Sequence, residues 1–361
     1  MSKPTSHKGR GTISAPGNRF ESLHIEQDPG AWEEIAATDP DFELDRPKTI
    51  VSHDDSQSII TQNHSPDLGF DFSLNPYRGC EHGCAYCYAR PYHEYLGFNC
   101  GIDFETRILA KPKAAELLEE TLSKKSWKPA SLACSGVTDC YQPVERELKV
   151  TRSCLEILAD FRNPVGIVTK NALATRDVDL LANLANHGAS AVVLSITTLD
   201  AKLAGTLEPR ASRPQARLEA IRTLSEAGIP TGVSVAPIIS GLNDHEIPAI
   251  LEAAAEHGAQ FATGIVLRLP FAVKDIFSAW LDQFAAGRKE TILNRVREMR
   301  GGSLNDSRFG HRMKGKGPLA EQIEQMLAVS KKRYGLDRKR EPLSIAAFRR
   351  RIPGQMELFD C

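Results

Sequence analysis

Three cysteines lie within eight residues of this chain, at Cys80, Cys84 and Cys87, and no fourth cysteine shares their turn. A structural zinc site is closed by four protein ligands, and an iron–sulfur cube held by protein alone needs four thiolates. Three thiols on one short loop instead suit three irons of a [4Fe–4S] cube whose fourth iron stays open for another ligand. Gly79 and Gly83 provide the backbone freedom that wrapping a cluster requires. The spacing therefore predicts a cluster-binding loop.

A zinc site is the alternative interpretation of the same loop. Cys100, His82 or His93 would then supply the fourth ligand, and the chain would be a non-enzymatic, zinc-binding nucleic-acid-binding module. A third interpretation is an electron-transfer protein. That interpretation is disfavoured because a cluster that only carries electrons gains nothing from an open iron.

The overall composition is that of an ordinary soluble globular protein, with 361 residues of which 41% are hydrophobic and 25% charged. No apolar run approaches the ~20 residues of a membrane span. The N-terminus lacks the apolar core of a signal peptide. Eight cysteines, three of them in a metal motif, favour a reducing compartment over a disulfide framework. We therefore expect a cytoplasmic protein that does not contact membranes.

Charge is distributed unevenly along the chain, although the formal net charge is only −1. Residues 288–351 are rich in Lys and Arg, with basic clusters at 331–333, 338–340 and 349–351. Basic segments of this kind often follow nucleic-acid phosphates, and they also occur as solvated helix faces. Nucleic acid is therefore one expected partner, and a solvated face is the open alternative.

From about residue 70, short β-branched runs alternate with helical patterns, which predicts βα units and a parallel sheet. The first expected strand ends at 75–79, directly before the cysteine loop. Further strands are expected over 131–135, 165–169, 191–196, 231–236 and 261–267, and helices over 112–125, 145–161, 178–187, 214–227, 245–257 and 273–285. Six strands fall short of a closed eight-stranded barrel. We expect a polar N-terminal extension over 1–60, a core over 61–287, and a basic, mainly helical segment over 288–361.

The cysteine run resembles the signature of the radical S-adenosylmethionine (SAM) superfamily, C-x3-C-x-aromatic-C, with Tyr86 at the aromatic position. The longer stretch over residues 75–90 is similar to the branch that contains spore photoproduct lyase. This resemblance implies a partial (β/α)6 barrel and a [4Fe–4S] cluster whose open iron is chelated by SAM. It also implies reductive cleavage of SAM to a 5′-deoxyadenosyl radical that abstracts hydrogen from a substrate. An electron donor such as flavodoxin or ferredoxin would supply the electron.

Polar residues that follow the expected strands are the candidate SAM contacts, because ligands of such sheets bind at the carboxyl ends of the strands. The Gly-Gly-Glu segment that many members use for the SAM amine is missing here. The candidates are Ser135, Thr138 and Asp139 for the amine, Lys170 and Arg210 for the carboxylate, Ser195 and Thr197 for the ribose, and Tyr86 beside the cluster. Each of these residues also has an ordinary explanation as a turn, cap, core or surface residue.

Cys134 is the candidate hydrogen donor, because its segment resembles the one where the lyase keeps a cysteine that returns a hydrogen atom to a radical intermediate. Cys140 is the alternative donor, and a buried strand cysteine is often just a small hydrophobe. The C-terminal segment, with a helix over 319–334, is expected to cover the lateral opening of the barrel, and residues 355–359 to dock an apolar end. The substrate is not specified: nucleic acid, protein, peptide and small molecules all remain open.

Overall fold

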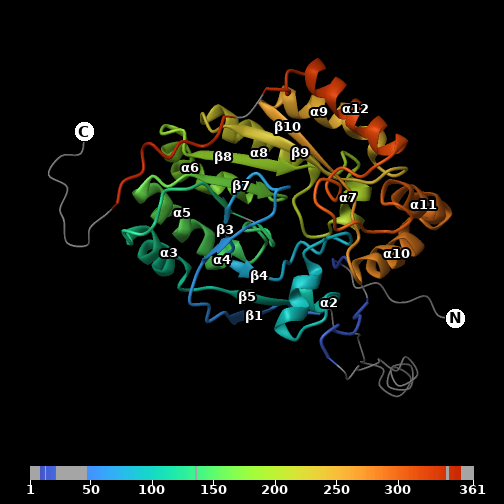
Figure 1. The fold of residues 1–361 in the computed structure, drawn as a ribbon, viewed down its shortest axis with the longest axis horizontal. Helices are drawn as coiled ribbons and strands as arrows, with labels where there is room; N and C mark the ends of the chain where they lie inside the picture. The colour runs from blue at the N-terminus through green and yellow to red at the C-terminus, as the bar shows by residue number, and fades with distance from the viewer. Residues whose placement is uncertain (1–8, 13, 22–46, 135, 339–340, 351–361) are drawn as a thin grey trace.

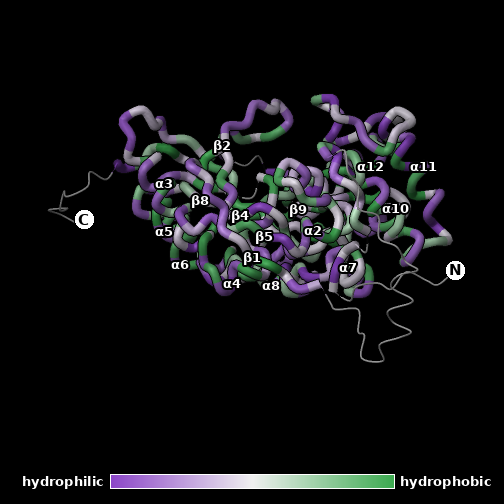
Figure 2. Tube along the Cα trace, turned by 90° about the horizontal axis from the view of Figure 1, so that it is seen from below, coloured by the Kyte–Doolittle hydropathy of each residue, from purple (hydrophilic) through white to green (hydrophobic). Residues whose placement is uncertain are grey.

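The computed structural model describes residues 9–12, 14–21, 47–134, 136–338 and 341–350. A curved sheet forms its centre, and helices line the outer side of the sheet (Figure 1). In Figure 2 hydrophobic residues lie mainly in the interior and hydrophilic residues mainly in the outer parts of the chain. No helix in these described ranges is long and apolar enough to cross a membrane.

Six parallel strands form the sheet in chain order, which confirms the expected partial barrel. They are β3 (Phe72–Leu74), β6 (Leu132–Cys134), β7 (Val165–Thr169), β8 (Ser190–Ser195), β9 (Thr231–Ile238) and β10 (Phe261–Val266). A short strand, β2 (Ile60–Gln62), pairs antiparallel with β3 at one edge, and β10 forms the other edge. Every residue of β8 is buried, because a central parallel strand is covered on both faces. The carboxyl ends of the six strands therefore converge on one side of the sheet.

The connecting helices lie close to the predicted ranges, except that the range 145–161 holds two helices and that α7 (Ala201–Leu207), between β8 and α8, was not predicted. The others are α3 (Ala114–Ser123), α4 (Glu145–Leu148), α5 (Val150–Phe161), α6 (Val178–Ala185), α8 (Pro214–Glu226), α9 (Ile247–Glu256) and α10 (Val273–Phe284). The single helix expected over 145–161 is wrong, because Lys149 has a left-handed φ of 54° that separates α4 from α5. The Glu145 carboxylate accepts the backbone N–H groups of Thr151 (2.9 Å) and Arg152 (3.3 Å). It thereby caps α5.

The first strand also differs from its expected position, because β3 ends at Leu74, before Pro76. Proline lacks the N–H that would continue the ladder. The next residues, Tyr77–Arg78, form β4 in a separate three-stranded sheet with β1 (Ile50–His53) and β5 (Arg107–Ala110). Two short helices, η1 (Arg90–Leu96) and α2 (Ile102–Thr106), connect the cysteine loop to β5. The sequence did not predict this small sheet, whose strands are too short to carry a period-two pattern.

The C-terminal part continues with α11 (Lys289–Met299) and α12 (Pro318–Arg333), and α12 packs on α9 and β10. The β10 edge is bonded to this segment, because Ala262 N–H donates to the Leu336 carbonyl (3.2 Å). Two of the basic residues are used structurally: the Arg349 and Arg350 guanidinium groups donate to the carbonyls of Asp160 and Trp127, both at 2.8 Å. Residues 355–359, with their expected apolar contact, lie outside the described ranges.

Candidate active site

The cysteine loop follows β4 and is buried within the protein. Cys80 and Cys84 are 6% and 7% exposed, and Cys87 is half-buried. The Cys80 N–H donates to the carbonyl of Phe104 (2.8 Å). Gly83 has a φ of 66°, and a Cβ there would lie 2.7 Å from the Glu105 carboxylate. The loop therefore needs glycine at this position both for its backbone conformation and for its packing.

A buried ion pair supports the loop from its outer side. Arg90, which is fully buried, donates to the Cys84 carbonyl (3.0 Å), the Gly101 carbonyl (2.9 Å) and the Glu105 carboxylate (2.5 Å). Burial alone would lower the pKa of Arg90, but Glu105 more than offsets this effect and the pKa is raised. The guanidinium fork thus ties the loop to α2.

The N-terminal residues that the structure describes close over the same loop. The Gly11 N–H donates to the second carboxylate oxygen of Glu105 (2.9 Å). A Cβ on Gly11 would lie only 1.4 Å from the Gly83 carbonyl oxygen, so no larger residue fits without movement of the backbone. Arg10 donates to the carbonyls of Glu105 (2.8 Å) and Pro47 (2.6 Å). No motif in the sequence indicated this contact.

Arg210, expected at the SAM carboxylate, lies against the cysteine loop. Its Nη2 donates to the Glu81 carboxylate (2.9 Å), and its backbone N–H donates to the His82 carbonyl (3.3 Å). Glu81 also accepts from the Thr49 hydroxyl (2.6 Å) and the Val144 N–H (2.6 Å). The Arg210 side chain is one-third exposed, so part of its guanidinium remains accessible.

Asp139, expected at the SAM amine, joins the ends of two strands to the loop. Its carboxylate lies 3.3 Å from His82 Nδ1 and accepts the Thr169 hydroxyl (2.7 Å) and the Lys170 N–H (2.8 Å). Burial alone would raise the pKa of Asp139, but His82 and these hydrogen bonds lower it to about 2. The group is therefore ionised at neutral pH, and much of its acceptor capacity serves the protein itself.

A buried carboxylate that the sequence reasoning missed, Glu208, organises the opposite side of the loop. It accepts hydrogen bonds from the Tyr86 phenol, the Thr197 hydroxyl and the guanidinium of Arg217. Burial opposes ionisation, yet Arg217 and the other donors lower the pKa of Glu208 to about 2. Tyr86 and Thr197 are thus brought together, but their polar atoms are bonded to Glu208. The sequence signal that could have identified Glu208 is the segment Glu208-Pro-Arg, of which only Arg210 was predicted as a site residue.

Lys170 and Ser195 lie at the ends of β7 and β8. The Lys170 ammonium is 5.8 Å from the Tyr86 ring centroid. It is close enough to counter, in part, the burial and the Glu208 charge that raise the pKa of Cys84. Ser195 is buried, and its carbonyl accepts from Arg217 (2.8 Å).

The remaining candidates form their printed contacts away from the cysteine loop, or lie outside the described ranges. The Thr138 hydroxyl donates to the Tyr77 carbonyl (3.0 Å). Cys134, at the end of β6, is 1% exposed and packs in the main hydrophobic core, as does Cys140. Ser135 lies outside the described residues. The structure therefore gathers Tyr86, Asp139, Lys170, Thr197 and Arg210 around the loop, whereas the two donor cysteines are core residues whose role stays a prediction.

The chemistry of the three thiols fits a cluster. Burial raises the pKa of Cys80, Cys84 and Cys87, so the free thiols are protonated at neutral pH and become thiolates when metal displaces their protons. Within the described residues no three His, Cys, Asp or Glu side chains form a group that would hold a metal ion. His82 and His93, two of the expected fourth zinc ligands, bond Asp139 and stack on Phe98 respectively.

The family model for the radical SAM superfamily matches residues 74–254. This stretch contains the cysteine loop and the strands β6 to β9. The chain belongs to the radical SAM superfamily, whose members use a [4Fe–4S] cluster and SAM.

Relatives and solved structures agree with this assignment. An uncharacterised protein of Mycobacterium tuberculosis is 35% identical over 234 residues, which are 64% of this chain and 68% of the relative. An uncharacterised protein of Methanocaldococcus jannaschii is 31% identical over 178 residues, covering 49% of this chain and 64% of that protein. The fold is similar to spore photoproduct lyase complexed with dinucleoside spore photoproduct, with a TM-score of 0.58, 14% identity, and coverage of 91% and 86% of the two chains. A mutant of that lyase with bound AdoMet and the dinucleoside also has a TM-score of 0.58, at 15% identity over 88% and 85%.

Proposed function

We propose that this chain is a radical SAM enzyme whose [4Fe–4S] cluster is held by Cys80, Cys84 and Cys87. The observation that carries the proposal is the buried loop that presents these three thiols at the carboxyl ends of the parallel strands. The loop is held by the Arg90–Glu105 pair and by the Tyr86–Glu208 bond.

When bound, the cluster and SAM supply a 5′-deoxyadenosyl radical that abstracts hydrogen from the substrate. The protein residues bind and orient. Lys170 and the accessible part of Arg210 provide positive charge for the SAM carboxylate. Asp139, ionised at neutral pH, provides negative charge on the side of the amine. Cys134 is the proposed hydrogen donor, because the S–H bond is weak, and Cys140 is the alternative.

Nucleic acid is the substrate class that we propose, with hydrogen-transfer chemistry similar to that of the photoproduct lyase. The support is the fold shared with a spore photoproduct lyase complexed with dinucleoside spore photoproduct, together with the basic residues of the C-terminal part. A cytoplasmic reductant such as flavodoxin or ferredoxin would supply the electron to the enzyme. Modification of a peptide or small molecule is the runner-up, because one fold serves many substrates.

Anaerobic reconstitution tests the cluster. The wild-type chain should bind about four irons with labile sulfide and cleave SAM to 5′-deoxyadenosine when reduced. Cys84→Ala should lose both properties. Cys154→Ala is the matched control, because Cys154 is equally buried but lies in α5, in the hydrophobic core, and it should retain both. Full iron content and SAM cleavage in Cys84→Ala would reject the proposal, as would stoichiometric, colourless zinc in the anaerobically prepared wild type.

A further inference from the structure

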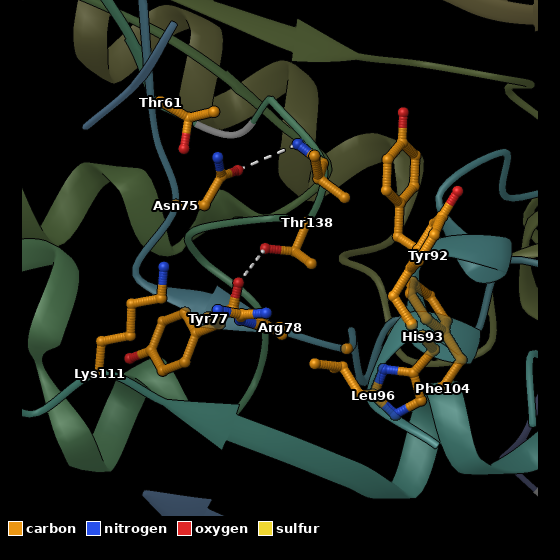
Figure 3. A pocket seen from close by; sticks show the side chains of 13 residues that line it. Thr61, Asn75, Tyr77, Arg78, Tyr92, His93, Leu96, Phe104, Lys111 and Thr138 are labelled. Atoms are coloured by element: carbon orange, nitrogen blue, oxygen red, sulfur yellow. Dashed lines mark hydrogen bonds between the residues drawn. The ribbon is translucent and has the colours of Figure 1, made fainter. Parts of the chain in front are cut away.

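A cavity of about 270 Å³ lies beside the cysteine loop (Figure 3). It is bounded by the ends of β3 and β6, by the small sheet, and by η1. Its lining includes Asn75, Arg78, Tyr92, His93, Tyr95 and Lys111. Its volume is just below the lower end of the range for small-molecule pockets. Of the candidate SAM contacts that the structure describes, only Thr138 lines it, so the cavity is a separate compartment.

The first notable feature of the cavity is a buried cation that has no direct partner among the described residues. Lys111 is 8% exposed, and its ammonium has no hydrogen bond or ion pair with any described residue. Asp54 is the carboxylate that interacts electrostatically with Lys111. Asp54 already forms an ion pair with Arg78, whose Nε lies 2.5 Å from Asp54 Oδ2. Burial lowers the pKa of Lys111, and Asp54 only partly counters that effect. Two cations thus face one carboxylate, which favours an anionic ligand.

The second feature is a pair of exposed aromatic rings at the rim of the cavity. Tyr92 and Tyr95, both on η1, are 54% and 68% exposed, and their ring centroids are 6.4 Å apart. The other side of the same two residues lines a hollow of about 330 Å³ with Arg268 and Phe271. Exposed aromatic rings beside arginines form the stacking surfaces of proteins that bind single-stranded nucleic acids.

The third feature is an unsatisfied polar atom inside the cavity wall. His93 is 1% exposed, and its Nε2 has no hydrogen-bond partner among the described residues. Burial lowers the pKa of His93 to about 4, so its imidazole is neutral at pH 7. Buried polar atoms are normally bonded, so this atom is an exception in the wall of the cavity. Asn75, on the opposite wall in Figure 3, adds a side-chain amide.

We propose that this cavity binds a single nucleotide, with its phosphate at Lys111 and Arg78 and its base on the rings of Tyr92 and Tyr95. The chemistry is the same for a free mononucleotide and for an unstacked nucleotide of a single strand. The cavity is too small for a base pair of a duplex. The relation of this site to the substrate rests on the proposed function. The site adds to that function the place, next to the cysteine loop, where an unpaired nucleotide is held.

Fluorescence anisotropy of a labelled single-stranded oligothymidylate with the reconstituted full-length chain, at low ionic strength and without reductant or SAM, tests the site. Lys111→Gln should weaken binding roughly tenfold and reduce the salt slope by about one. Tyr95→Ala should weaken it roughly tenfold as well, and because Tyr95 is largely exposed this variant will fold. Lys111→Arg should keep most of the affinity. Lys125→Gln, at an exposed lysine outside the cavity, is the matched control.

Thymidine monophosphate is added as a competitor to identify the source of the nucleotide. If the mononucleotide displaces the oligomer at the concentrations at which it saturates the protein, the natural ligand is a free nucleotide. If only the oligomer binds, the natural ligand is a nucleotide of a single strand. Both results support the site. Wild-type affinity in both Lys111→Gln and Tyr95→Ala, no binding of either probe, or equal binding of polyglutamate would overturn it. Since no SAM is present, loss of this binding and failure of SAM cleavage are independent results.

Discussion

Replacement of Glu208 by glutamine is the most incisive test of how the cysteine loop is held. Glu208 is 2% exposed and accepts from Arg217, Tyr86 and Thr197. The substitution preserves volume but removes the charge. Arg217, with a 1% exposed side chain, would lose its charged partner and be left with the carbonyls of Ser212 (2.7 Å) and Ser195 (2.8 Å) and the neutral amide of the new glutamine.

The magnitude follows from the pKa of Glu208, which is lowered from 4.5 to about 2 in the folded protein. A difference of that size corresponds to about 3 kcal/mol of folding free energy. Breaking a buried ion pair by removing one partner costs a similar ~3–5 kcal/mol. Because the folded pKa lies below the unfolded value, this contribution is complete above pH 4.5. It is lost as the pH falls from 4.5 towards 2.

Urea unfolding of the cluster-free chain, followed by circular dichroism, measures the effect. At pH 7 the midpoint of Glu208→Gln should lie about 1 M below that of the wild type, for a slope of about 3 kcal/mol per M. The gap should narrow below pH 4.5. Glu119→Gln, at an exposed glutamate of α3, should unfold with the wild type. Equal midpoints at pH 7, or a gap that does not change with acid, would refute the reasoning.

Two further substitutions test other supports of the site. Gly11→Ala should shift the N-terminal segment away from the loop, because the new Cβ would lie 1.4 Å from the Gly83 carbonyl oxygen. The reconstituted cluster should then bleach faster in air than in the wild type and in the control Gly69→Ala, whose Cβ meets no atom within 4 Å. Equal bleaching rates would contradict this contact. Arg90→Lys should lower the iron content after reconstitution, because an ammonium cannot reproduce the four bonds that the planar guanidinium makes. Wild-type iron content would show that the guanidinium is dispensable.

Much of the fold could be predicted because its signals are local. The strand over residues 165–169 lies where the β-branched run places it, and Gly188, Gly228 and Gly258 end helices with left-handed φ angles of 65°, 78° and 91°. The spacing of the cysteines fixed the candidate cluster loop without any knowledge of its surroundings. Errors arose where local signals were weak: nothing in the pattern over 145–161 marks Lys149 as the break between two helices.

The amino-acid sequence by itself determined the family, the order of strands and helices, and the three thiols, since each depends on residues close together in the chain. Only the tertiary structure decided which charges are paired. Arg217 pairs with Glu208 and is buried, whereas Arg210 pairs with Glu81 and is partly accessible. The cavity between β3, β6 and η1 was likewise undetermined, because its walls come from segments distant in sequence. Such partners are selected by packing and by the cost of leaving a buried charge alone, and neither is encoded in spacing.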